Sequence, residues 1–200
     1  MRIIAGTHRA CLFQGPDDET TTRPVTDRAK ETLFNRLYSL GMFSVEDEAG
    51  NPTPFNAADV FSGTGSMGLE CLSRGASSTL FVEQDKRIRE ILEANLKGLK
   101  FEPGRSRILS SSALSTVWID ALPPATRLVF LDPPYKMVEE GGQKDQLLAL
   151  FPALLTKMEE GGIVVFRTPR GVDLPDIGGF DMVSFHVGTM TFYFYQKPMA

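Results

Sequence analysis

Cysteine and histidine are scarce in this sequence, which has two of each: Cys11 and Cys71, and His8 and His186. The two cysteines lie far apart and form no C-x-x-C pair, so the sequence indicates neither a disulfide framework nor a zinc site. The histidines are isolated from one another as well. We therefore expect no bound metal ion and a reducing compartment.

Long apolar runs are also missing. No stretch approaches the ~18 consecutive apolar residues of a membrane-spanning helix. Residues 1–6 lack the apolar core of a signal peptide. These absences predict a cytoplasmic protein with no membrane partner.

A positive net charge is the third absence, because the formal charge is −4 at pH 7. Proteins that coat bare nucleic acid gain affinity by neutralising phosphates, so that class is disfavoured. An enzyme with a local basic face is not excluded. The 200 residues, 42% of them hydrophobic, fit one domain over residues 1–200. We interpret residues 1–24 as its N-terminal extension, a hairpin around Gly6 followed by a polar loop.

Strand and helix patterns alternate along the rest of the chain. The expected helices span 26–40, 69–74, 85–99, 114–122 and 147–155. The expected strands span 57–61, 79–83, 107–110, 128–131 and 162–166, followed by a hairpin of 182–186 and 189–196. This order predicts an α/β fold with a doubly wound, mostly parallel, seven-stranded sheet that ends in an antiparallel hairpin.

The most informative stretch is an apolar strand, 128–131, that runs directly into Asp132, Pro133, Pro134 and Tyr135. The prolines end the strand, because they fix φ and donate no backbone hydrogen bond. Asp132 and Tyr135 are therefore expected on a stiff turn at the carboxyl end of a central strand. Open α/β sheets bind their ligands at that end.

This turn suits methylation of an exocyclic amino group on a base. Such a nitrogen is a poor nucleophile, since its lone pair is delocalised into the ring. The Asp132 carboxylate and the Pro133 carbonyl could accept from the amino group and stabilise its developing positive charge. Tyr135 could stack on the base. The plainer alternative is a Pro-Pro turn in which Asp132 caps and Tyr135 packs.

A glycine-rich turn after the first strand indicates a nucleoside site. Gly63, Gly65 and Gly68 have the spacing of the dinucleotide fingerprint, in which the backbone approaches a ligand closely. Glu83 follows about twenty residues later, where an acid binds the ribose hydroxyls of an adenosine-containing cofactor. The glycine spacing alone also fits a nicotinamide-dependent oxidoreductase. On the helix of 26–40 we expect Lys30 to be an ordinary solvated charge.

Together these motifs resemble class I S-adenosylmethionine-dependent amino-methyltransferases, which have a Rossmann-like fold. Residues 2–6, 23–35, 61–76 and 129–135 resemble more closely the bacterial (RsmD-like) family that methylates N2 of a guanine in 16S ribosomal RNA. The resemblance implies S-adenosyl-L-methionine as cofactor and S-adenosyl-L-homocysteine as product. It also implies ribosomal RNA, within an assembling 30S subunit, as the partner.

The resemblance further implies a role for particular residues. Residues 132–135 would be catalytic, and Arg9, Arg23 and Arg28 would contact RNA. The cofactor contacts would come from Asp59, Phe61, Gly63, Thr64, Gly65, Glu83, Gln84, Ser112 and Ala113. Two alternatives stay open: methylation of adenine N6 or cytosine N4 in DNA or other RNA, and a binding module without catalysis.

Overall fold

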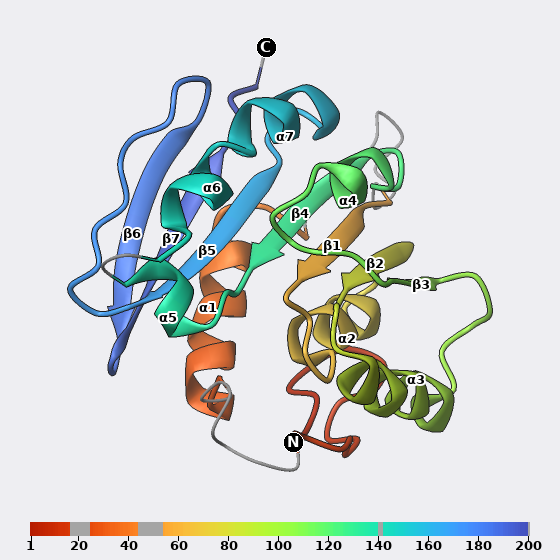
Figure 1. The fold of residues 1–200 in the computed structure, drawn as a ribbon. Helices are drawn as coiled ribbons and strands as arrows, with labels where there is room; N and C mark the ends of the chain where they lie inside the picture. The colour runs from red at the N-terminus through yellow and green to blue at the C-terminus, as the bar shows by residue number, and fades with distance from the viewer. Residues whose placement is uncertain (17–24, 44–53, 140–141, 200) are drawn as a thin grey trace.

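The computed structural model describes residues 1–16, 25–43, 54–139 and 142–199, and within these ranges seven strands form one sheet. The strands are β1 (Asn56–Val60), β2 (Ser78–Val82), β3 (Ser106–Leu109), β4 (Thr126–Leu131), β5 (Ile163–Pro169), β6 (Asp181–Val187) and β7 (Met190–Gln196). Their order across the sheet is β3-β2-β1-β4-β5-β7-β6 (Figure 1). Strands β1 to β5 pair in parallel, and β6 and β7 are antiparallel. The predicted doubly wound sheet with a C-terminal antiparallel hairpin is confirmed.

The helices of the described residues are α1 (Asp27–Ser39), α2 (Ser66–Ser73), α3 (Lys86–Leu99), α4 (Val117–Asp120), α5 (Tyr135–Val138), α6 (Lys144–Leu148) and α7 (Phe151–Lys157). Thr26 and Asp85 cap α1 and α3 with their side-chain oxygens, as expected. The single helix predicted over 147–155 is wrong. The chain there forms the end of α6 and then α7, which carries Pro152 in its first turn, where no backbone donor is needed.

The sheet separates two layers of helices (Figure 1). Helices α4 to α7 pack on one face, where Val129 and Leu131 of β4 point. Helix α1 packs on the other face against Leu128 and Phe130. Alternate residues of β4 thus enter different cores, which is why its sequence is continuously apolar. Trp118 of α4 is fully buried in the first of these cores.

The first residues of the chain lie against α2 and α3. An antiparallel bridge joins Arg2 to Leu12, and the Ile3 amide donates to the Cys11 carbonyl at 3.0 Å. A Cβ on Gly6 would lie 1.9 Å from the Ser73 carbonyl oxygen, so only glycine allows this approach to α2. The predicted polar loop falls mainly on 17–24, outside the described residues. In the described part of the chain, none of the helices is long and apolar enough to cross a bilayer.

Candidate active site

The glycine turn and the Asp132 turn meet at the carboxyl ends of β1, β2 and β4. Strand β1 has β2 on one side and β4 on the other, so the chain order reverses beside it. The Asp132 amide donates to the Val60 carbonyl at 3.3 Å, and the Ser62 amide donates to the Val82 carbonyl at 3.1 Å. These two bonds join the ends of all three strands. A doubly wound sheet binds its ligands at such a switch point.

The glycine turn has a backbone that few other residues allow. Phe61, Gly63 and Gly65 have φ angles of 64°, 54° and 97°, and Phe61 is one of four non-glycine residues with positive φ in the described part of the chain. A Cβ on Gly65 would lie 2.6 Å from Leu92 Cδ1, whereas a Cβ on Gly63 would meet nothing within 4 Å. Gly65 therefore lies close against Leu92 of α3 with a φ that favours glycine, and Gly63 borders open space.

Asp59 of β1 holds the segment in which the glycine turn enters α2. Its side chain is buried, and Oδ2 accepts from the Gly68 amide at 2.7 Å, in the first turn of α2. Burial raises the pKa of Asp59 well above its usual value, and the bonds from Gly68 and Met67 oppose that shift. The charges of Asp132 and Glu83 raise the pKa further. These contacts fix the start of α2 relative to β1.

Glu83 lies beside the same turn. Its Oε2 accepts from the Gly63 amide at 3.0 Å, and its Oε1 accepts from the Asp85 amide at 2.9 Å. The carboxylate thus links the glycine turn to the start of α3. Two carboxylate oxygens offer about four lone-pair sites, so acceptor capacity is left for a ligand hydroxyl.

Asp132 forms an ion pair that sequence patterns did not reveal. Its Oδ1 accepts from Nε of Arg167 on β5, and the Asp132 side chain keeps 19% of its exposure while Arg167 keeps 4%. The Arg167 guanidinium carbon lies 5.3 Å from the ring centroid of Tyr135. Burial raises the pKa of Asp132, and the Arg167 charge and hydrogen bond lower it. The signal in the sequence was a lone basic residue at the end of an apolar strand.

Three buried hydroxyl oxygens at the site have no hydrogen-bond partner within the described residues: Ser62 Oγ, Ser66 Oγ and the Tyr135 hydroxyl. Buried polar atoms in folded proteins are nearly always paired, so these atoms indicate where a polar ligand would bind. The open space at Gly63 lies in the same turn. The turn, together with Glu83, therefore fits a nucleoside-containing cofactor with a polar amino-acid tail.

The other predicted cofactor residues differ in their surroundings. Thr64 is buried in the turn, and its carbonyl accepts from Asn95 Nδ2 at 3.0 Å. Gln84 is exposed next to Glu83. Ser112 is exposed and accepts from the Leu114 amide at 3.2 Å, while Ala113 is buried. The structure thus places Thr64 in the glycine turn and Gln84 next to Glu83, and it shows no bond from Ser112 to the turn.

The predicted RNA contacts are not joined to the Asp132 turn by any interaction that the structure describes. Arg9 is exposed in the N-terminal segment, and Arg28 is exposed on α1. Arg23 lies outside the described residues. A role for the two described arginines in RNA binding stays a prediction.

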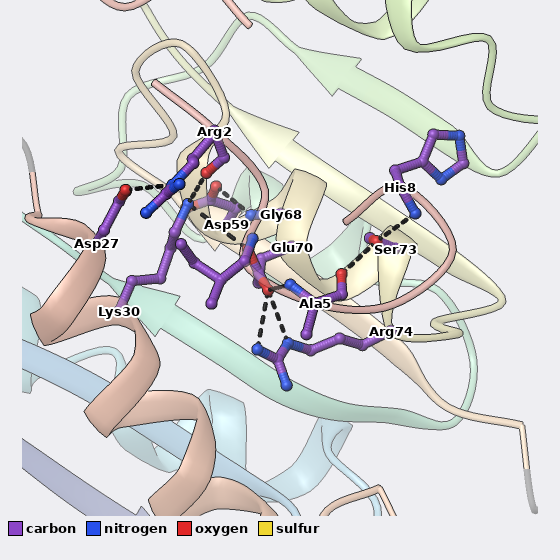
Figure 2. A network of polar contacts seen from close by, with 11 residues as sticks. Arg2, Ala5, His8, Asp27, Lys30, Asp59, Gly68, Glu70, Ser73 and Arg74 are labelled. Atoms are coloured by element: carbon purple, nitrogen blue, oxygen red, sulfur yellow. Dashed lines mark hydrogen bonds and ion pairs between the residues drawn. The ribbon is translucent and has the colours of Figure 1, made fainter. Parts of the chain in front are cut away.

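A polar network that the sequence did not reveal centres on Glu70 of α2 (Figure 2). Glu70 is fully buried and accepts from the amides of Ile4 and Ala5 at 2.8 and 3.0 Å. Arg74 donates to Oε1 at 2.9 Å, and Lys30 Nζ lies 3.5 Å from Oε2. The expectation that Lys30 is solvated is wrong. It is buried, because its amino group is held by Glu70 and by the Arg2 carbonyl at 2.7 Å.

Two further features lie away from this site. A hollow lined by Thr79, Arg107 and Pro123, among others, lies where β2 and β3 begin, and none of the predicted site residues lines it. Among the described residues, no three histidine, cysteine or acidic side chains are grouped so that they could hold a metal ion.

The sequence and the fold of this chain are similar to those of several known proteins. A model of the family described as "Conserved hypothetical protein 95" matches residues 1–196. The YlbH protein of Bacillus subtilis (strain 168) is 31% identical over 180 residues, which are 90% of this chain and 88% of the relative. Ribosomal RNA small subunit methyltransferase D of Escherichia coli (strain K12) is 35% identical over 136 residues, 68% of this chain and 61% of that protein. The solved structure of Escherichia coli yhhF has a TM-score of 0.75 at 26% identity and covers 99% of this chain and 98% of its own.

Proposed function

This chain belongs to the family described as conserved hypothetical protein 95, and on that premise we propose that it methylates the N2 amino group of a guanine in 16S ribosomal RNA, with S-adenosylmethionine as methyl donor. Relatives from Escherichia coli and Haemophilus influenzae carry the name ribosomal RNA small subunit methyltransferase D. The observation that carries the proposal is the hydrogen bond from the Asp132 amide to Val60. It sets a carboxylate next to a turn that fits a nucleoside cofactor.

The described residues divide into two groups by what they would do. Asp59 and Glu83 fix the backbone of the glycine turn, so the donor is bound by a preformed surface. S-adenosylmethionine supplies an electrophilic methyl group on a sulfonium. Much of the rate enhancement would come from holding that methyl in line with the target nitrogen.

Asp132 and Pro133 would act on the amino group. An ionised Asp132 accepts a hydrogen bond from the NH2 group, and the Pro133 carbonyl accepts the second. Both oxygens stabilise the positive charge that grows on nitrogen as the methyl arrives. Asp132 need not be a strong base, because the proton of the methylated, cationic nitrogen is already acidic. Tyr135 would stack on the base.

The target base has to leave its helix for this reaction. The guanine amino group faces the minor groove of a paired helix, and Asp132 is recessed at the end of a strand. An unpaired or flipped-out guanine is therefore the expected substrate. An assembling subunit that presents such a base would also suit a chain with a net charge of −4.

The test is methyl transfer from labelled S-adenosylmethionine to naked 16S RNA, 30S particles and duplex DNA, followed by nucleoside analysis. We expect N2-methylguanosine, and we expect Asp132→Ala to lower turnover roughly 100-fold or more while cofactor binding persists. Asp181→Asn, an exposed change on β6, is the matched control. Methylated adenine or cytosine would overturn the guanine assignment, and near-normal turnover of Asp132→Ala would overturn the assigned chemistry.

A further inference from the structure

Arg167 is a buried cation that the proposed chemistry does not yet use. It lies on β5, whose Phe166 pairs with Leu131 of β4. Arg167 and Asp132 each follow one of these paired residues, so the register itself brings them together. Only 3% of the Arg167 surface is exposed. A buried charge needs a partner to offset its loss of hydration, and Asp132 is a partner that the structure shows.

Arg167 contacts two side chains of the proposed catalytic turn, those of Asp132 and Tyr135. Its Nε donates to Oδ1 of Asp132, and its guanidinium lies over the Tyr135 ring at 5.3 Å from the centroid. Guanidinium groups stack on aromatic faces and bind carboxylates with fixed geometry, and a lysine ammonium reproduces neither property well. One side chain from β5 thus fixes two residues that follow β4.

We propose that Arg167 is a positioning residue for amino-group methylation. It holds Asp132 by one carboxylate oxygen and covers one face of Tyr135. The target amino group then binds at the other oxygen, and the base stacks on the other ring face. This inference rests on the proposed function, because it assigns Asp132 and Tyr135 to the substrate. Arg167 itself touches neither substrate nor cofactor in this assignment.

The charges around Asp132 give Arg167 a second effect. Asp59 on β1 and Glu83, which follows β2, lie at the same end of the sheet, and the charges of Asp132 and Glu83 raise the pKa of Asp59. Burial also raises the pKa of Asp132, and Arg167 lowers it. Without Arg167, ionisation of Asp132 would require a higher pH. The acidic limb of kcat/KM would then move upward in pH.

The experiment compares wild type with Arg167→Gln and Arg167→Lys, and uses Arg170→Gln, an exposed change just past β5, as the matched control. We expect Arg167→Gln to lower kcat roughly 10- to 100-fold, as loss of an orienting partner does elsewhere, and to shift the acidic limb to higher pH. Arg167→Lys keeps the charge, so its acidic limb stays close to wild type while kcat recovers only in part. A purely structural role would lower the amount of folded enzyme and leave the limb in place.

Carboxyl NMR of Asp132 separates this inference from the proposed function. An unchanged Asp132 titration in Arg167→Gln, or wild-type kcat with an unmoved limb, overturns the inference alone. Absence of guanine methylation by the wild type overturns the proposed function, and the NMR titration still decides whether Arg167 sets the state of Asp132. If Arg167→Gln does not fold, the split between kcat and KM in Arg167→Lys carries the test.

Discussion

Replacing Glu70 by glutamine tests whether the N-terminal segment is held by one buried carboxylate (Figure 2). In the native chain this carboxylate receives hydrogen bonds from the Ile4 and Ala5 amides, and it pairs with Arg74 and Lys30. Glutamine keeps the volume and one acceptor oxygen. It removes the charge and points a donor NH2 group at partners that are all donors themselves.

The size of the effect follows from how deeply the partners are buried. Lys30 keeps 1% of its side-chain exposure and Arg74 keeps 15%, so Arg74 can turn toward water and Lys30 cannot. Removing one member of a buried ion pair costs about 3–5 kcal/mol. Burial lowers the pKa of Lys30, and the Glu70 charge raises it, so Lys30 loses its proton more easily once Glu70 is neutral. Because Lys30 can become neutral, we expect the free energy of unfolding to fall by about 3 kcal/mol, the lower end of the range for a broken buried pair.

The assay is urea unfolding, with thermal unfolding beside it, of wild type, Glu70→Gln and the exposed α3 control Glu93→Gln. A loss of about 3 kcal/mol corresponds to a fall in Tm of roughly 6–12 °C for a chain of this size, and the control is expected to stay within about 0.5 kcal/mol. Hydrogen exchange at the Ile4 and Ala5 amides should accelerate in Glu70→Gln. A loss below about 1 kcal/mol, with unchanged exchange at these amides, would refute the reasoning from buried charge.

Three further outcomes are expected. Gly68→Ala places a Cβ 2.2 Å from Phe81 Cε1 and should destabilise the fold by about 1–3 kcal/mol. Gly98→Ala adds a Cβ in open space on α3 and should stabilise the fold by about 0.5–1 kcal/mol. Urea midpoints equal to that of wild type in the two variants would contradict these expectations. Asp59 has a pKa raised above 3.8 by burial, so the folded state binds its proton more tightly and loses stability as pH rises through the raised pKa. Asp59→Asn should therefore gain stability relative to wild type with rising pH, and a pH-independent difference in urea midpoint would count against this sign. Arg2→Gln should cost no more than about 1 kcal/mol in the same unfolding assay, because its ion pair with Asp27 is largely exposed.

The fold was predictable because its signals are local. The apolar run 128–131 is buried on both faces, and Pro133 and Pro134 end it where the structure ends β4. Thr26 and Asp85 mark the starts of α1 and α3, because their side chains cap these helices. The break between α6 and α7 was missed because a proline in a first turn resembles a proline inside a helix until the boundary is known.

The polar contacts of the site were not predictable in the same way. The pair of Arg167 and Asp132 depends on the register of β4 against β5, which no local pattern encodes. Lys30 lies off the apolar stripe of α1 and was therefore placed in solvent. Its burial depends on its ion pair with Glu70 of α2, which lies some forty residues further along the chain, beyond β1. Sequence spacing locates strand ends, and tertiary pairing decides which charges meet there.

Helix α2 depends on tertiary contacts for its stability, because it spans only Ser66–Ser73 and is too short to be stable alone. Tertiary contacts fix it at both ends: Asp59 holds the Gly68 amide, and the Ser73 hydroxyl donates to the Ala5 carbonyl at 2.6 Å. Glu70 binds the N-terminal segment between them. The glycine turn leads directly into this helix, so its position depends on the N-terminal segment as well as on β1. The buried Glu70 network is therefore part of what shapes the proposed cofactor surface, although none of its residues lies in the glycine turn.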